Sequence, residues 1–190
     1  VDDAGDNGLR SLEVMALETI RTGWQGRSLA HHARAMAMYP KPYLQKLAAI
    51  LKKADMGIVS DPHTGPLHAR VRELLEEGVL VSLGQDDISD AYYPYGRNNM
   101  LEVAFLNSHL LWFTTREDME TLYTMVTTNP ARAIGLKGFE IKEGAVANLV
   151  VLDQPNVLEA LRFHEKPKYV ISHGKLVDQK KMDEIIRENS

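Results

Sequence analysis

The sequence contains no cysteine, so it can form neither disulfide bonds nor a thiolate metal site. A metal ion would therefore have to be held by imidazole and carboxylate groups. No apolar run approaches the roughly 20 residues that a membrane-spanning helix requires. There is also no block of basic residues, and the net charge of −4 argues against nucleic acids and anionic membranes as partners. We therefore expect a cytoplasmic protein that binds neither.

Strand-like and helix-like segments alternate along the first part of the chain, with short connections between them. Apolar residues recur at helical spacing over 9–20 and 42–54, and apolar runs at 28–30, 58–60 and 79–83 are typical of strands. With 44% hydrophobic residues, the chain can bury a sizeable core. The alternation predicts β/α units around a parallel sheet.

The run Val79–Leu83 predicts a strand that is buried on both faces. Gly84 follows it and allows a turn or a close approach between backbones. The adjacent carboxylates Asp86 and Asp87 then lie at the carboxyl end of the strand, where catalytic groups sit in barrels of parallel strands. Two neighbouring carboxylates repel unless a cation or a shared proton offsets their charge. The alternative interpretation is a polar turn in which Asp86 caps a following helix.

Histidines also follow predicted strands. His31 and His32 are adjacent, so in a strand they would face opposite sides and only one would point into a shared site. His63 lies in a loop rich in helix and strand breakers, and His68 is expected on the surface of the following helix.

The second part of the sequence begins with helical patterns. Residues 99–113 are strongly apolar and predict a packed helix, with a subunit interface as the second interpretation. Thr115 and Asp118 resemble a capping box that opens another helix. Asn129 and Pro130 then begin a short helix.

Strand-like segments dominate the last 50 residues. Residues 147–153 and 169–177 predict strands, and His173-Gly174 suits a tight hairpin turn within the second segment. A charged, weakly amphipathic stretch at 180–189 predicts a terminal helix.

Six stretches of the sequence resemble a single enzyme family. They are His32–Met36, Gly84–Asp87, Asp90–Gly96, Asn98–Leu101, Asn129–Ala133 and Gly144–Asp153. On these motifs the chain resembles the C-terminal half of an amidohydrolase-superfamily enzyme of the cytosine deaminase type, and the resemblance covers nearly the whole chain.

The resemblance implies an α/β fold, the C-terminal half of a (β/α)8 TIM-type barrel followed by C-terminal strands of a small β domain. Residues 1–140 would form the second half of the barrel, and residues 141–190 would complete the small composite domain. The chain starts at Val1 without an initiator methionine. We therefore expect it to be a segment of a longer protein and to require the N-terminal half of that protein for activity. A homo-oligomer is also expected.

The resemblance also implies roles for individual residues and one divalent metal ion, Zn or Fe. Asp86 would bind the metal and handle the proton of its bound water, and His32 would steady the developing tetrahedral centre. Asp87 would hydrogen-bond the substrate ring. Tyr92 sits where cytosine deaminases place a ring-stacking aromatic, and the alternative is that it packs its own loop.

Two features depart from the family pattern. Asp3 occupies the place of a glutamate that acts as proton shuttle, and its side chain is one methylene shorter. A shuttle must lie within hydrogen-bond reach of its proton, so a different substrate shape or reaction is an open alternative. The loop 61–68 is compact, and there His63 takes a substrate-facing role that no family residue supports.

The expected function is metal-dependent hydrolysis of a small N-heterocycle that is cytosine-like, creatinine-like or pterin-like. Metal-bound hydroxide would attack a C–N carbon, and ammonia would leave. One alternative is an amidohydrolase that removes an N-alkylamine from an aminotriazine-type ring. A second alternative is a non-catalytic fragment that serves as an interaction module.

Overall fold

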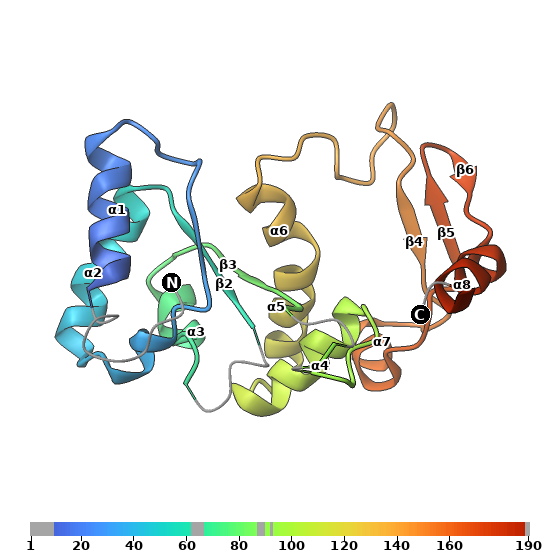
Figure 1. The fold of residues 1–190 in the computed structure, drawn as a ribbon, viewed down its shortest axis with the longest axis horizontal. Helices are drawn as coiled ribbons and strands as arrows, with labels where there is room; N and C mark the ends of the chain where they lie inside the picture. Colours follow the sequence, from blue (N-terminus) through green and yellow to red (C-terminus); the bar gives the residue numbers. More distant parts are fainter. Residues whose placement is uncertain (1–9, 62–66, 87–89, 92, 189–190) are drawn as a thin grey trace.

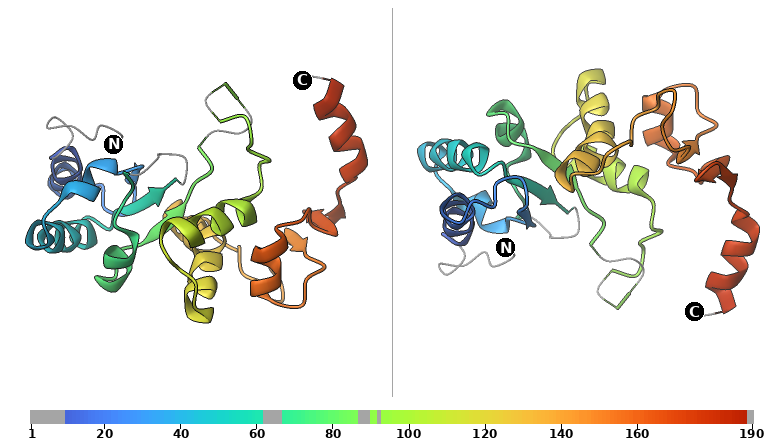
Figure 2. Two further views of the ribbon diagram at one scale, coloured as in Figure 1. Left: turned by 90° about the horizontal axis from the view of Figure 1, so that it is seen from below. Right: turned by 90° about the horizontal axis from the view of Figure 1, so that it is seen from above.

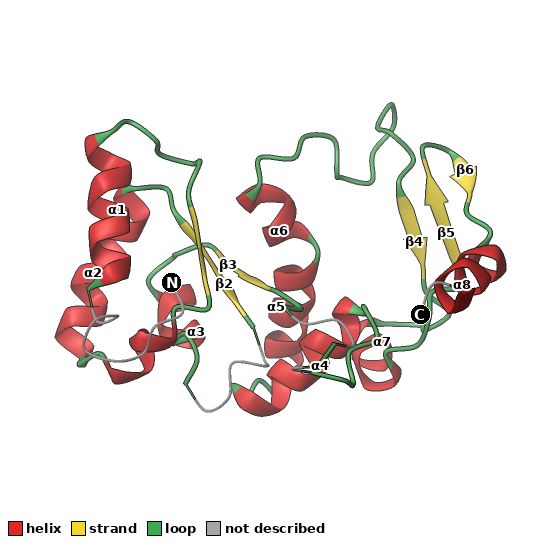
Figure 3. Ribbon diagram, in the orientation of Figure 1, coloured by secondary structure: helices red, strands yellow, loops and turns green. Residues whose placement is uncertain are grey.

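The computed structural model describes residues 10–61, 67–86, 90–91 and 93–188 (Figure 1). It is a mixed α/β structure, as the sequence predicts. Two groups of strands lie apart in the molecule, with helices between them (Figure 3). No helix within the described residues combines the length and the apolar character needed to cross a membrane.

The first group is a three-stranded parallel sheet in the order β1-β2-β3. It consists of β1 (Leu29–His31), β2 (Gly57–Ser60) and β3 (Val81–Leu83). Leu29 pairs with Gly57, and Ile58 pairs with Val81. Every residue of β2 and β3 is buried, as expected for the run at 79–83, although that strand begins only at Val81.

The helices that precede or join these strands are α1 (Ser11–Arg21), α2 (Lys41–Lys53) and α3 (Val71–Glu76). The first two have the predicted apolar stripes. The stripe of α2 consists of Leu44, Leu47, Ala48 and Leu51, all of them buried. Because α2 joins β1 to β2 and α3 joins β2 to β3, the predicted β/α units are confirmed.

Several details differ from the predictions. Gly57 is the first residue of β2, one residue before the predicted strand, and a Cβ there would lie 3.0 Å from Leu29 Cδ2. A short 3-10 helix, η1 (Arg34–Met38), follows β1 and was not predicted. His68 precedes α3 instead of lying on it, and it is only partly exposed.

The central helices are α4 (Met100–Leu110), α5 (Arg116–Val126) and α6 (Thr128–Ala133). The predicted capping box is present, since Thr115 accepts from the Asp118 amide and the Asp118 carboxylate accepts from the Thr115 amide. Asn129 is buried within α6, where its side-chain amide donates to the Val81 carbonyl of β3 at 2.7 Å. This bond ties α6 to the parallel sheet.

The second sheet is antiparallel, in the order β4-β5-β6. Its strands are β4 (Leu149–Val151), β5 (Tyr169–Ser172) and β6 (Lys175–Leu176). The predicted hairpin turn at His173-Gly174 is confirmed, and both residues have positive φ angles of 50° and 76°. The proposed boundary between two domains at residue 140 stays a prediction.

Two more helices flank this sheet. The helix α7 (Val157–Phe163) contacts α4 and α5 and was not predicted. The terminal helix α8 (Gln179–Glu188) was predicted and lies at the far end of the molecule from α1 and α2 (Figure 2).

An ion pair with a third partner links α1 to α2. Glu13 is 7% exposed and accepts hydrogen bonds from Lys46 Nζ and Tyr43 OH, both at 2.7 Å. These two bonds lower the pKa of Glu13 below its ordinary value of 4.5. Burial, followed by the bond to Glu13, raises the pKa of Tyr43 to about 12, so the phenol stays neutral at physiological pH.

We expect Glu13→Gln to destabilise the whole protein by about 1.5–3 kcal/mol at pH 7, since it removes a nearly buried charge-assisted bond. A lowered folded-state pKa stabilises only above the unfolded value, so the difference should shrink as the pH falls below 4.5. Denaturation midpoints at pH 7 and 4 measure it. Glu18→Gln, on the exposed side of α1, should have little effect. A deficit for Glu13→Gln that persists unchanged at pH 4 would contradict the assignment.

Candidate active site

Polar side chains follow all three parallel strands at the carboxyl edge of the sheet. His31 ends β1 and His32 comes next, Asp61 follows β2, and Asp86 lies shortly after β3. The carboxyl ends of parallel strands meet at one edge, which is where open α/β sheets and barrels bind ligands. Two of the residues predicted from sequence, His32 and Asp86, are therefore at the same edge.

The backbone at the end of β1 changes the prediction for the two histidines. His32 lies beyond the strand in the left-handed region, with a φ of 64°, and Ala33 has a φ of 51°. The His32 amide still donates to the Val59 carbonyl at 2.9 Å. Strand alternation therefore ends at His31, so the argument that adjacent strand residues face opposite sides does not apply to His32. That only one of the two rings points into the site stays a prediction.

Burial and neighbouring charges both act on the pKa of the His31 ring. Desolvation, and then the neighbouring His32, lower the pKa of His31, whereas the carboxylate of Asp86 opposes them and raises it. Both side chains thus lie within electrostatic range of His31. The ends of β1 and β3 are close enough for their charged groups to interact across β2.

Asp61 is a member of this cluster that the sequence did not single out. It is 3% exposed, and its Oδ2 lies 3.6 Å from His32 Nδ1. That distance is within ion-pair range and longer than a hydrogen bond. One feature of the sequence could have predicted it. Asp61 directly follows the apolar strand β2, whose only polar residue is its last one, Ser60.

Gly84 gives Asp61 its space. The Gly84 amide donates to the Ser60 carbonyl at 3.0 Å. The backbone therefore stays beside β2 for one residue after β3 ends. A Cβ at position 84 would overlap Asp61 Oδ1 and lie 2.9 Å from Val59 Cγ1. The close backbone approach predicted for Gly84 is therefore confirmed.

Asp86 adopts a left-handed conformation, with a φ of 61°. Aspartate tolerates this region better than most residues. The alternative in which Asp86 caps a following helix is not supported. The described residues between it and Met100 contain no helix, and the cap of α4 is Asn99, whose side chain accepts from the Leu101 amide.

The remaining predicted site residues, Asp3, His63, Asp87 and Tyr92, lie outside the described residues, and their roles stay predictions. Nearby, the Tyr93 amide donates to Asp90 Oδ1 at 2.9 Å.

The donor atoms at this edge are carboxylate and imidazole, which Zn²⁺ and Fe²⁺ accept. Across 10–61, 67–86, 90–91 and 93–188, however, no three histidine, aspartate or glutamate side chains converge as a metal site would require. The types of donor atom at this edge therefore fit a metal ion. The described residues, however, supply too few of them to complete the coordination of such an ion.

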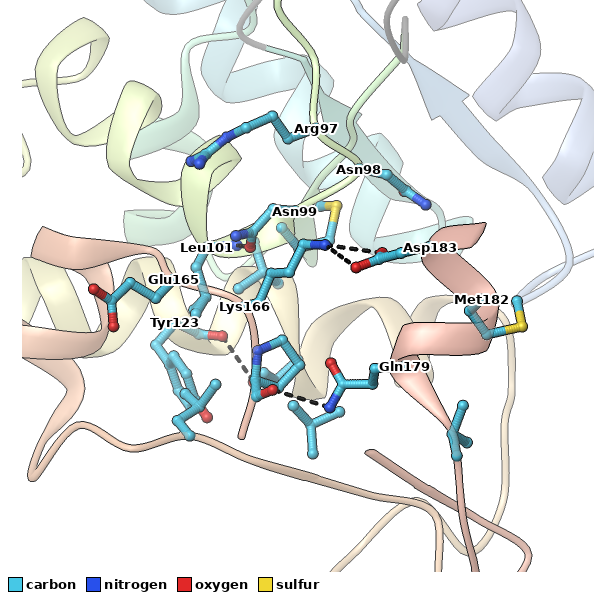
Figure 4. Close-up of a pocket in the computed structure, with 17 residues that line it drawn as sticks. Arg97, Asn98, Asn99, Leu101, Tyr123, Glu165, Lys166, Gln179, Met182 and Asp183 are labelled. Atoms are coloured by element: carbon cyan, nitrogen blue, oxygen red, sulfur yellow. Dashed lines mark hydrogen bonds and ion pairs between the residues drawn. The ribbon is translucent and has the colours of Figure 1, made fainter. Parts of the chain in front are cut away.

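A cavity of about 500 Å³ lies elsewhere, between α4, α5, β4 and α8 (Figure 4). Several of its polar side chains are already engaged: Lys166 Nζ binds the Asp183 carboxylate at 2.9 and 2.8 Å, and Gln179 donates to the Pro167 carbonyl at 3.1 Å. It contains no residue of the strand-end cluster. We therefore place the candidate active site at the sheet edge.

Comparison with known proteins assigns the class. The model of the amidohydrolase family matches residues 1–178, and the chain belongs to that family. Among its relatives, N-isopropylammelide isopropyl amidohydrolase of Pseudomonas sp. (strain ADP) is 29% identical over 187 residues, which is 98% of this chain and 46% of that protein.

Solved structures give the same class. The 5-methylcytosine deaminase of Klebsiella pneumoniae with 5-fluorocytosine matches with a TM-score of 0.82 and 32% identity, over 93% of this chain and 46% of that one. N-isopropylammelide isopropylaminohydrolase of Burkholderia multivorans matches with a TM-score of 0.87 and 26% identity, over 92% and 45%. The chain thus spans about half the length of these proteins. The family prediction is confirmed, whereas the three described parallel strands do not by themselves show a barrel.

We expect Gly84→Ala to destabilise the whole protein by about 1–3 kcal/mol, because the new methyl group overpacks against Asp61. Asp61→Ala makes room for that methyl, so Gly84→Ala should cost less in this background. Gly57→Ala is the matched control at the opposite end of the sheet, where the added atom would lie 3.0 Å from the terminal Cδ2 of Leu29 and 3.4 Å from the Leu80 carbonyl oxygen, so it overlaps neither. Chemical denaturation of the four variants measures the costs. Equal costs of Gly84→Ala with and without Asp61 would contradict the packing.

Proposed function

We propose that the whole protein carrying this chain is a metal-dependent amidohydrolase that deaminates a small N-heterocycle of cytosine-like, creatinine-like or pterin-like shape. The observation that carries this proposal is the gathering of His32, Asp61 and Asp86 at the carboxyl edge of the parallel sheet. Its supporting comparison is a 5-methylcytosine deaminase that is 32% identical over 93% of the chain.

In this proposal each residue has a defined task. Asp86 holds the metal ion and accepts a proton from the attacking water, and Asp3 shares the transfer of that proton to the leaving group. His32 donates to the substrate atom on which negative charge develops, as a preorganised donor does in hydrolytic sites. Asp87 and Tyr92 bind the ring by a hydrogen bond and by stacking.

His63 contributes a further substrate contact from the loop after β2. A divalent ion, when bound, lowers the pKa of a coordinated water toward about 7. Zn²⁺ and Fe²⁺ are the candidates. Asp86 supplies the ligand from the described part of the chain, and the other ligands come from residues outside it.

The second candidate reaction is removal of an N-alkylamine from an aminotriazine-type ring. It is favoured by the N-isopropylammelide hydrolase of Pseudomonas, which is 29% identical over 98% of the chain. The shorter Asp3 in place of glutamate fits an active site with a different leaving group. Both reactions attack a ring carbon bonded to nitrogen and differ in the amine released.

The parallel strands belong, in this proposal, to the second half of a TIM-type barrel that the N-terminal half of the protein completes. Exposed apolar side chains on the small sheet support the need for a covering partner: Val150 is 63% exposed and Leu176 is 67% exposed. A cytoplasmic homo-oligomer remains part of the proposal. A non-catalytic interaction module is the third candidate, and it predicts a whole protein without bound metal or turnover.

We expect Asp86→Asn in the whole protein to lower turnover by about 10²–10⁴-fold, because it removes a group that handles a proton, and to reduce metal content. Plasma emission spectrometry measures the metal, and amine release measures turnover. Asp153→Asn is the matched control, because Asp153 is an exposed carboxylate paired with Lys168. Full turnover with normal metal content in Asp86→Asn would refute the proposal.

A panel of heterocycles separates the two reactions. We expect the wild-type whole protein to release ammonia from at least one of cytosine, 5-methylcytosine, creatinine and pterin. Isopropylamine from N-isopropylammelide, with no ammonia from the others, would instead establish the second reaction. Mass spectrometry of the products identifies the amine.

A further inference from the structure

We propose that Asp61 is a positioning residue that orients the imidazole of His32, an inference that rests on the proposed function. Its carboxylate would hold the His32 ring with Nδ1 facing Asp61 and leave Nε2 for the substrate. Neither the sequence motifs nor the family resemblance assigned a role to Asp61.

The place of Asp61 in the sheet fixes its backbone on both sides. It follows Ser60, the last residue of the central strand β2. On one side, the His32 amide donates to the Val59 carbonyl at 2.9 Å, and on the other, the Gly84 amide donates to the Ser60 carbonyl at 3.0 Å. The segments that follow β1 and β3 thus remain hydrogen-bonded to β2 up to the residue before Asp61.

The two carboxylate oxygens of Asp61 face these two neighbours. Oδ2 lies 3.6 Å from His32 Nδ1, and Oδ1 occupies the space that a side chain at Gly84 would fill. The Asp61 side chain is only 4% exposed, and the His32 side chain is 21% exposed. The carboxylate therefore has little room to turn away, while the imidazole keeps access to the site.

The backbone of His32 brings its ring to this carboxylate. His32 and Ala33 have φ angles of 64° and 51°, a region that costs an L-residue roughly 1–2 kcal/mol. Strained residues of this kind persist where the surroundings fix them, and they concentrate at functional sites. Ala33 is buried, so the turn is held in place by packing.

The chemistry follows from the burial of a charge. A carboxylate removed from water is costly unless a partner offsets it, and an imidazole N–H is such a partner. In this role the Asp61 carboxylate accepts from Nδ1–H, and it favours the protonated ring in which Nε2 also carries a hydrogen, so that Nε2–H can donate to the substrate. In enzymes, such contacts tighten when substrate binds, so 3.6 Å in the free protein is compatible with the role.

The test uses the whole protein and two readouts. The ¹⁵N resonances of the His32 ring, assigned by their loss in His32→Gln, report its tautomer without any substrate. The kcat and KM for 5-methylcytosine and N-isopropylammelide report catalysis. We expect Asp61→Asn to change the His32 tautomer pattern and to lower kcat about 10–100-fold with KM within about twofold. In the His32→Gln background, Asp61→Asn should cause no further loss.

Two more variants keep the outcome decisive. Gly84→Ala displaces the Asp61 carboxylate without removing it and should shift the same His32 resonances, even if Asp61→Asn fails to fold. Asp118→Asn removes a largely buried carboxylate that caps α5 and pairs with Arg72, so it should cost stability and leave His32 unchanged.

Unchanged His32 resonances in both Asp61→Asn and Gly84→Ala would overturn the inference, as would losses of kcat that multiply in the double variant. If Asp61→Asn has no effect while Asp86→Asn abolishes turnover, the positioning role fails and the proposed function stands. If no heterocycle is turned over, the proposed function fails and the resonances alone decide the His32–Asp61 contact.

Discussion

The parallel pairing of three strands is the constraint on which the candidate site depends. Backbone bonds continue past the strand ends, from His32 to Val59 and from Gly84 to Ser60, so the residues that follow remain in register. Parallel pairing alone brings the carboxyl ends of β1, β2 and β3 to one edge. Residues widely separated in the sequence then lie close together, and their charges interact. The carboxylate of Asp86, for example, raises the pKa of His31 against the effect of burial.

Burial of Asp61 connects packing to chemistry at this edge. A carboxylate that is 3% exposed would destabilise the fold if nothing offset its charge, and a hydrophobic residue of the same size would pack there at lower cost. Gly84 supplies the space at the cost of backbone freedom, and His32 supplies the imidazole. A buried carboxylate, a glycine and a histidine with left-handed backbone are therefore adjacent, and each of them is unfavourable for stability by itself. This is the pattern expected where function, and not stability, has selected the side chains.

Sequence reasoning succeeded where the signal is local. The stripe of α2, the Thr115–Asp118 capping box and the His173-Gly174 turn each depend on residues within a few positions of one another, and all were found. The short helix α7 was missed because only Ala160 and Leu161 are buried on it, too few to establish a period.

The surroundings of Asp61 could not be predicted from the sequence, because its neighbours His32 and Gly84 lie on other β/α units and meet it only in the folded sheet. The 3-10 helix after β1 was missed for a related reason: it follows from left-handed backbone at His32 and Ala33, which neither residue type predicts. Position 86 was found because a strand, a glycine and paired carboxylates are consecutive.

The bond from Asn129 to Val81 extends the same reasoning to the second part of the chain. Leu80 and Gly84 bond to β2, so the Val81 carbonyl, on the alternate side of β3, faces away from β2 toward the open edge of the sheet. A buried carbonyl without a partner would be costly, and the Asn129 amide satisfies it at 2.7 Å. The helix α6 thereby fixes the strand that leads to Asp86. The motif at Asn129–Ala133, which entered as a family resemblance, thus has a physical task in holding the candidate site.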